Sequence, residues 1–215
     1  REELKELCEN AGMTEREGKS IFDPWGGIIR ALCESGKICH RVQEKKAYTI
    51  CPGFQPMEEE PSRLELARRY FTYFGPATVR DAAYFFGTTQ TKVKSWLKQL
   101  PVLEINLNGN TYYYMEHKLT GEEIPQCLFL AGFDQLMLGY DKTESLFLHK
   151  EYMREIFTLS GIVRPSLLIN GNVAGWWNRN NKKITVSLFC DTDKDLIAEK
   201  AEDLWGKNPI TFRKV

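Results

Sequence analysis

Long hydrophobic runs are missing from this chain of 215 residues, of which 42% are hydrophobic and 27% are charged. No apolar run approaches the roughly 20 residues that a membrane-spanning helix needs, and no signal peptide is recognisable. We therefore expect no membrane partner and predict a soluble, cytoplasmic protein of two or three small domains. Because the chain opens on Arg1 within a helical pattern, we expect it to be part of a longer protein.

The motifs of common catalytic sites are also missing. The three histidines form no HExxH motif, no glycine-rich loop could cradle a phosphate, and the six cysteines contain no CxxC pair. Cys33, Cys39 and His40 lie close together in "CESGKICH", with Cys51 further on, but this spacing matches no common zinc site. We expect buried free thiols, no metal and no small-molecule cofactor.

An excess of charge is missing from the whole chain but not from its parts. Lys and Arg number 29, as do Asp and Glu, so the formal net charge is zero. Residues 62–118, however, hold eight Lys or Arg against four Asp or Glu, whereas residues 1–61 and 119–215 each carry a small acidic excess. The middle segment is the one that a polyanion would attract.

This basic segment contains two short helical patterns in "DAAYFFGTTQTKVKSWLK". Apolar residues recur at helical spacing at 79, 82, 83 and 86, with Thr78 and Asp81 placed as a capping box, and again at 93, 96, 97 and 100. Gly87 separates the two patterns. Because so short a turn does not let the helices lie antiparallel, we predict a helix-turn-helix.

The polar face of the second helical pattern, Gln90 to Leu100, offers donors of the kind that contact phosphates and base edges. Taken alone, three lysines on a helix are more often a solvated face. The strand patterns around Asn108-Gly109 favour DNA, because they predict a hairpin beside the helices. The predicted DNA contacts are Arg80, Gln90, Thr91, Lys92, Lys94, Ser95, Lys98, Asn108 and Asn110.

Three helical patterns followed by a hairpin give the order of a winged helix, and the chain contains this order twice. In residues 62–118 the first helix is predicted to begin at Ser62, which with Glu65 resembles a capping box. Residues 1–52 repeat the order, with a hairpin in "KICHRVQEKKAYTI", and predict an incomplete second winged helix. Residues 53–61 are rich in proline and glutamate, which is typical of a linker.

Residues 119–215 show short β-prone runs such as "CLFLAGF", "SLFLH" and "ITVSLF", and helical patterns at 150–157 and 194–205. Asn170-Gly171 predicts a hairpin turn between two of the runs. The predicted fold class is therefore α+β, with tandem winged-helix domains followed by a C-terminal antiparallel β-barrel-like domain with two helices.

Three segments, "ARRYFTYFGPATVRDAAYFFG", "FLAGFDQLMLGYDK" and "GIVRPSLLINGNVAGWWNR", together resemble the winged-helix DNA-binding family that includes the AlkZ-like DNA glycosylases. The resemblance implies tandem winged helices and a β-barrel, with Phe133-Asp134 on the active-site side of the barrel. There Asp134 could orient a substrate, or equally it could brace a turn. Arg164 could contact a phosphate, or pair with a carboxylate such as Asp134.

Glycosylases of this family carry a Gln-x-Gln or Gln-x-Asp motif that positions the attacking water, and this chain has neither. The six glutamines are followed two places later by Lys45, Met57, Lys92, Pro101, Leu128 and Met137. Either the motif lies upstream of these residues, or the protein is a non-catalytic member.

The function that we predict is duplex DNA binding through the winged helix-turn-helix. One alternative is the C-terminal part of a DNA glycosylase that acts on alkylated or cross-linked bases. Another is a protein-interaction module with an aromatic surface, although core packing is the commoner fate of such residues. The aromatic residues concerned are Tyr70, Phe71, Tyr73, Phe74, Tyr84, Phe85 and Phe86.

Overall fold

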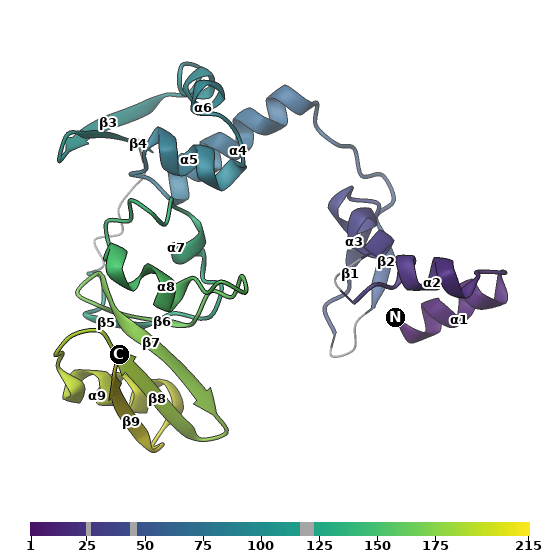
Figure 1. Cartoon of the computed structure of the whole chain (residues 1–215). Coiled ribbons are helices and arrows are strands. Elements are labelled where there is room, and N and C mark those ends of the chain that lie inside the picture. The colour runs from purple at the N-terminus through teal and green to yellow at the C-terminus, as the bar shows by residue number, and fades with distance from the viewer. Residues whose placement is uncertain (25–26, 44–46, 117–122) are drawn as a thin grey trace. The chain divides into compact units, whose positions relative to one another are not determined.

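The structure is a computed structural model that describes residues 1–24, 27–43, 47–116 and 123–215. These residues form two compact units, Arg1–Pro61 and Ser62–Val215 (Figure 1). Both units combine helices with β-strands, so the chain is a mixed α and β protein, as predicted. Within the described ranges, no helix has the length and apolar character needed to cross a membrane.

The first unit holds three helices and a two-stranded antiparallel hairpin. These elements are α1 (Glu2–Asn10), α2 (Glu15–Ile21), α3 (Gly27–Glu34), β1 (Ile38–His40) and β2 (Tyr48–Ile50). A capping box begins α2, because Thr14 and Glu17 each accept a hydrogen bond from the other's backbone N–H. Residues 25–26, which precede α3, and the hairpin residues 44–46 lie outside the described ranges.

The cysteines are less buried than predicted. Cys127 is buried, but Cys39 and Cys190 are exposed, and Cys8, Cys33 and Cys51 are half-buried. The prediction of buried thiols is therefore wrong for Cys39 and Cys190. Over the described part of the chain, no group of three or more His, Cys, Asp or Glu side chains is arranged to hold a metal ion.

The second unit begins with the predicted helices and hairpin. These elements are α4 (Glu59–Tyr73, whose first turn belongs to the preceding unit), α5 (Val79–Phe86), α6 (Gln90–Leu97), β3 (Val102–Leu107) and β4 (Asn110–Met115). Both apolar faces are confirmed, because Ala82, Val93 and Trp96 are at most 4% exposed within one core. Gly87 ends α5 in the left-handed conformation with φ 59°, as a tight turn between two helices requires.

The capping box predicted at Ser62 is wrong, because α4 already begins at Glu59. Pro61 fits inside the first turn of α4, where backbone N–H groups have no partner within the helix. Glu65 instead accepts hydrogen bonds from Arg68 and Arg69, with nitrogen–oxygen distances of 2.7 and 2.8 Å. These bonds lower the pKa of Glu65 to about 2.

The remainder of the second unit is built on one five-stranded sheet in the order β5-β6-β7-β8-β9. Its elements are β5 (Cys127–Phe129), α7 (Gln135–Leu138), the 3-10 helix η1 (Lys150–Tyr152), α8 (Met153–Ile156), β6 (Ser166–Ile169), β7 (Asn172–Asn180), β8 (Lys183–Leu188), α9 (Lys194–Trp205) and β9 (Ile210–Lys214). The first four strands are antiparallel, and α9 connects β8 to the parallel strand β9.

The predicted antiparallel barrel is not formed by the described residues. The sheet stays open, with β5 and β9 as its edges, and the parallel pairing of β9 follows from the crossover through α9. The β-prone run "SLFLH" forms no strand and leads into η1. Helices cover both faces of the sheet, since α9 packs on one face through Ile197 and α8 on the other through Ile156.

Candidate nucleic-acid interface

A hollow of about 420 Å³ lies where the helix-turn-helix, the β3–β4 hairpin and the segment after α7 meet. Of the predicted DNA contacts, the structure brings four to this hollow, namely Arg80, Gln90, Lys94 and Asn110. They come from α5, α6 and the start of β4. The other lining residues are Pro76, Thr78, Val79, Asp81, Thr111, Tyr112, Tyr113, Tyr140, Glu144, Ser145 and Leu146.

The remaining predicted contacts lie outside the lining of the hollow. Thr91 and Ser95 on α6 and Lys98 directly after it are exposed, and Lys92 on α6 is half-buried. The Ser95 hydroxyl donates to the Lys92 carbonyl oxygen at 2.7 Å, so its proton is used within the helix. Asn108 is exposed at the tip of the hairpin, where its φ of 52° suits the tight turn predicted for Asn-Gly.

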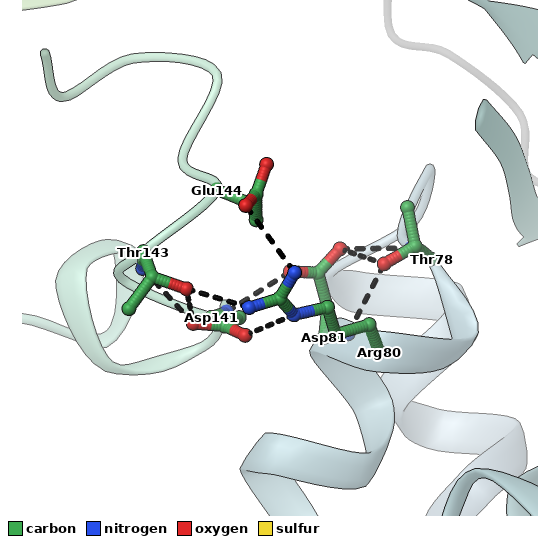
Figure 2. Close-up of polar contacts among 6 residues, drawn as sticks. All are labelled: Thr78, Arg80, Asp81, Asp141, Thr143 and Glu144. Carbon is green, nitrogen blue, oxygen red and sulfur yellow. Dashed lines mark hydrogen bonds and ion pairs between the residues drawn. The ribbon is translucent and has the colours of Figure 1, made fainter. Parts of the chain in front are cut away.

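Arg80 is held by residues far along the chain (Figure 2). Its Nε donates to Asp141 Oδ2 at 2.5 Å, and its Nη2 donates to Thr143 Oγ1 at 2.8 Å. Its Nη1 lies 3.3 Å from Glu144 Oε1. The predicted DNA contact Arg80 is thus already part of an ion-pair network, which ties the start of α5 to the segment after α7.

Asp81, the neighbour of Arg80, links the same two parts of the unit. Its Oδ2 accepts from the Thr78 backbone N–H at 2.9 Å and completes the predicted capping box of α5. Its Oδ1 accepts from the Asp141 backbone N–H at 2.9 Å (Figure 2). Since Asp81 is 8% exposed, both bonds are largely shielded from water.

Two tyrosines complete the attachment of this segment to α4. The Tyr70 hydroxyl donates to the Gly139 carbonyl oxygen at 2.7 Å, and the Tyr140 hydroxyl donates to the Phe74 carbonyl oxygen at 2.8 Å. A Cβ atom on Gly139 would lie 2.3 Å from the Phe74 ring, so only glycine permits this approach. Burial raises the pKa of both Tyr70 and Tyr140, and their hydroxyls stay protonated donors at neutral pH.

The carboxylate of Asp141 is kept ionised by its neighbours. Its burial by itself would raise its pKa, but the hydrogen bonds from Thr143 and the ion pair with Arg80 outweigh this effect and lower the pKa of Asp141. The same hydrogen bond to Asp141 raises the pKa of Arg80. At neutral pH the two side chains therefore form a charged pair beside the hollow.

Comparison with known proteins shows the family of the chain. The model of the family described as DNA glycosylase AlkZ-like matches residues 10–205. The chain belongs to the AlkZ-like DNA glycosylase family. It is 23% identical over 190 residues to an interstrand DNA cross-link repair glycosylase of Streptomyces sahachiroi, a match that covers 79% of this chain and 50% of that protein.

The fold is similar to that of a solved AlkZ structure. The chain is similar to the DNA glycosylase AlkZ of Streptomyces sahachiroi with a TM-score of 0.74 and 20% sequence identity, over 100% of this chain and 64% of that chain. The chain thus spans about half the length of the curated AlkZ-like relative that it matches.

The residues carried over from the AlkZ-like resemblance lie around the sheet, outside the lining of the hollow. Phe133 is 50% exposed with a φ of 57°, and its N–H donates to the Val163 carbonyl oxygen. Asp134 caps α7 by accepting from the Leu136 N–H at 2.9 Å. Arg164 pairs with Glu155 at 2.9 Å and stacks over Trp176, so the suggested pairing with Asp134 is wrong.

The segment that completes the hollow was missed by the sequence interpretation. Asp141, Thr143 and Glu144 were assigned to a separate β-rich domain, away from the helix-turn-helix. A local signal was present in the Asp-x-Thr spacing, since Asp141 accepts from both the N–H and the hydroxyl of Thr143. Such a turn predicts a braced loop, but it does not predict that Arg80 binds there.

The aromatic cluster proposed as a partner surface is mostly packed inside. Tyr70 and Phe71 are at most 2% exposed, and Phe74 and Phe86 pack against the same core. Tyr73, Tyr84 and Phe85 are the exposed members. This distribution is typical of core packing and does not favour the protein-interaction alternative.

Proposed function

We propose that this chain is the DNA-binding part of a DNA glycosylase that acts on alkylated or cross-linked bases in duplex DNA. The match of the AlkZ-like family model to residues 10–205 is the observation that carries the proposal. The curated relative, named an interstrand DNA cross-link repair glycosylase, supports the class of substrate. The match covers only 50% of that relative, and we propose the same class of activity for the whole protein.

In this proposal residues 62–118 form a winged helix. The order of α4, α5, α6 and the β3–β4 hairpin supports this proposal. So does an antiparallel bridge between Ala77, which lies between α4 and α5, and Tyr113 of β4. Residues 1–52 would be a second winged helix with a shorter hairpin, joined through residues 53–58, because residues 59–61 of the predicted linker belong to α4. Residues 119–215 would then be a third, β-rich domain.

Duplex DNA would bind with α6 toward a groove and the hairpin tip beside it. Lys94 and Gln90 line the hollow from α6 and Asn110 from β4, so a backbone phosphate in the hollow would meet donors from both elements. Lys92 and Lys98 would neutralise neighbouring phosphates, while Thr91 and Ser95 would lie near the base edges. Most of the affinity would come from phosphate neutralisation and would fall with salt.

Glycosylase chemistry would need groups beyond those in this chain. None of its glutamines has glutamine or aspartate two places later, so the water-positioning pair of the family would be supplied by residues outside these 215. The alternative is a member of the family that binds DNA without cutting the glycosidic bond.

A base-release assay tests the proposal. Duplexes that carry an N7-alkylated guanine or an interstrand cross-link would be incubated with the chain alone and with the longest natural protein that contains it. We expect the longer protein to release the damaged base and the chain alone to bind these duplexes without releasing it. Absence of base release by the longer protein would overturn the glycosylase part of the proposal.

A further inference from the structure

The hollow contains charges of both signs, which is unexpected for a surface that meets a polyanion. Arg80 and Lys94 line it together with the carboxylates of Asp81 and Glu144. Asp81 is buried and its two oxygens are used by Thr78 and the Asp141 N–H. Glu144 differs, because its side chain is 61% exposed.

The guanidinium of Arg80 is divided between two kinds of partner. Its Nε and Nη2 donate to Asp141 and Thr143, and the Asp141 side chain is only 10% exposed. Its Nη1 is paired with the exposed Glu144 carboxylate at 3.3 Å (Figure 2). The first two bonds fix the position of the guanidinium, whereas an exposed ion pair of this length contributes little to stability and exchanges readily.

We propose that Glu144 is a built-in competitor of DNA, whose carboxylate occupies the place of a backbone phosphate at Arg80 Nη1 in the free protein. This inference rests on the proposed function and names the ligand as a phosphodiester group. When DNA binds, the phosphate replaces Glu144 at Nη1, while Asp141 and Thr143 keep the guanidinium in place. Lys94, which lines the same hollow from α6, contributes the second cation of this phosphate site.

The arrangement has a consequence for binding strength. A duplex must displace Glu144 before one of its phosphates can contact Arg80 Nη1, so the carboxylate lowers the affinity for every duplex that binds in this way. Glu144 thereby acts as a residue that restricts non-specific binding, and it belongs to the segment after α7 rather than to the helix-turn-helix.

The test is a titration of the chain with an undamaged duplex over a salt series, followed by fluorescence anisotropy. Glu144→Gln removes the competing charge and keeps the size of the side chain. Glu151→Gln is the matched control, because Glu151 is equally exposed at 61% and pairs with His149 outside the hollow. Thermal melting of each variant confirms that it is folded.

We expect Glu144→Gln to tighten low-salt binding at least about threefold, because the phosphate no longer has to displace a carboxylate, and we expect this gain to shrink as the salt concentration rises. Glu151→Gln should not tighten binding comparably. In an Arg80→Gln background the effect of Glu144→Gln should disappear. If Arg80→Gln is not folded, Arg80→Lys replaces it, because lysine keeps a charge near Asp141 but has no second nitrogen that could pair with Glu144.

Equal effects of the two glutamate variants would overturn the inference, because they would reflect net charge alone. So would unchanged or weaker binding by Glu144→Gln while the unmodified chain binds DNA, and in that case the proposed function stands. If neither the unmodified chain nor any variant binds the duplex at low salt, the inference fails together with the proposed function.

Discussion

Asp141 is the residue on which the candidate interface depends most. It accepts bonds from Arg80 and Thr143 through its side chain and donates one to Asp81 through its backbone. These contacts join the helix-turn-helix to the segment after α7. Removing the charge of Asp141 would leave the guanidinium of Arg80 without its fixed partner, although the backbone bond to Asp81 would remain.

The lowered pKa of Asp141 predicts how stability depends on pH. A carboxyl whose pKa is lower in the folded than in the unfolded chain contributes stability that is present above its ordinary value of 3.8 and is lost as the pH falls through the folded value. We therefore expect Asp141→Asn to be less stable than the unmodified chain at neutral pH. The difference should shrink progressively below about pH 4.

Urea unfolding at a series of pH values checks this prediction. Asp203→Asn serves as the control, because Asp203 is exposed on α9, and it should follow the pH dependence of the unmodified chain. Parallel stability curves for Asp141→Asn and the unmodified chain over the whole acid range would contradict the assigned role of Asp141.

At the residue scale, the sequence predicted which side chains of α6 are exposed, but it did not predict which residues pair with Arg80 and Arg164. The exposed polar face of α6 was predicted correctly because helical spacing alone decides which residues lie opposite Val93 and Trp96. Arg80 was predicted as a DNA contact, and its carboxylate partner, 61 residues away, was not predicted. No local pattern encodes such a contact, and the same is true of the pairing between Arg164 and Glu155.

At the scale of elements, the turn between α5 and α6 sets the geometry of the helix-turn-helix. Gly87 has a φ of 59°, and a Cβ atom built on it would meet nothing within 4 Å. An alanine at this position would therefore cost only backbone strain, on the order of 1 kcal/mol. We expect Gly87→Ala to lower the free energy of unfolding by about that amount.

Asparagine tolerates the left-handed conformation better than alanine does, so Gly87→Asn should cost less than Gly87→Ala. Urea unfolding of the two variants would measure both costs, and their DNA affinities should equal that of the unmodified chain. A loss of stability that is larger for asparagine than for alanine would show that side-chain space, not backbone conformation, limits the position.

Elements that carry their own start and stop signals were predicted well, and those that depend on distant contacts were not. As expected, α5 begins after the capping box of Thr78 and Asp81 and ends at Gly87. The start of α4 was misplaced because proline within a first turn resembles proline before a helix. The barrel was predicted wrongly because closure depends on whether edge strands meet, which strand patterns in a sequence do not encode.

At the scale of the whole molecule, the two units differ in how much apolar surface they bury. Residues Ser62–Val215 contain all three buried apolar clusters found in the described residues. In Arg1–Pro61, by contrast, Ile29 is the single buried apolar side chain among the described residues. We expect backbone amides of the first unit to exchange with solvent faster than those of the second.

A shortened chain that begins at Glu58 should keep the fold of the second unit. We expect each unit of the full chain to unfold in its own transition. The melting temperature of the shortened chain should differ from that of the second unit in the full chain by less than about 4 °C, the shift that ~1 kcal/mol causes in a domain of this size. Removal of residues 207–215 is the contrast, because it deletes β9 from the sheet and should abolish the transition. Loss of folding in the chain that begins at Glu58 would contradict the division into units.

The central claim is that α6 presents its lysines to the phosphates of duplex DNA. The most direct measurement is duplex binding by fluorescence anisotropy over a salt series, with the chain compared to a variant that combines Lys92→Ala, Lys94→Ala and Lys98→Ala. Lys207→Ala, an exposed position beyond α9, is the control. We predict weaker binding and a log-log salt slope shallower by roughly two to three for the triple variant alone. Equal slopes for the triple variant and the unmodified chain would contradict the claim.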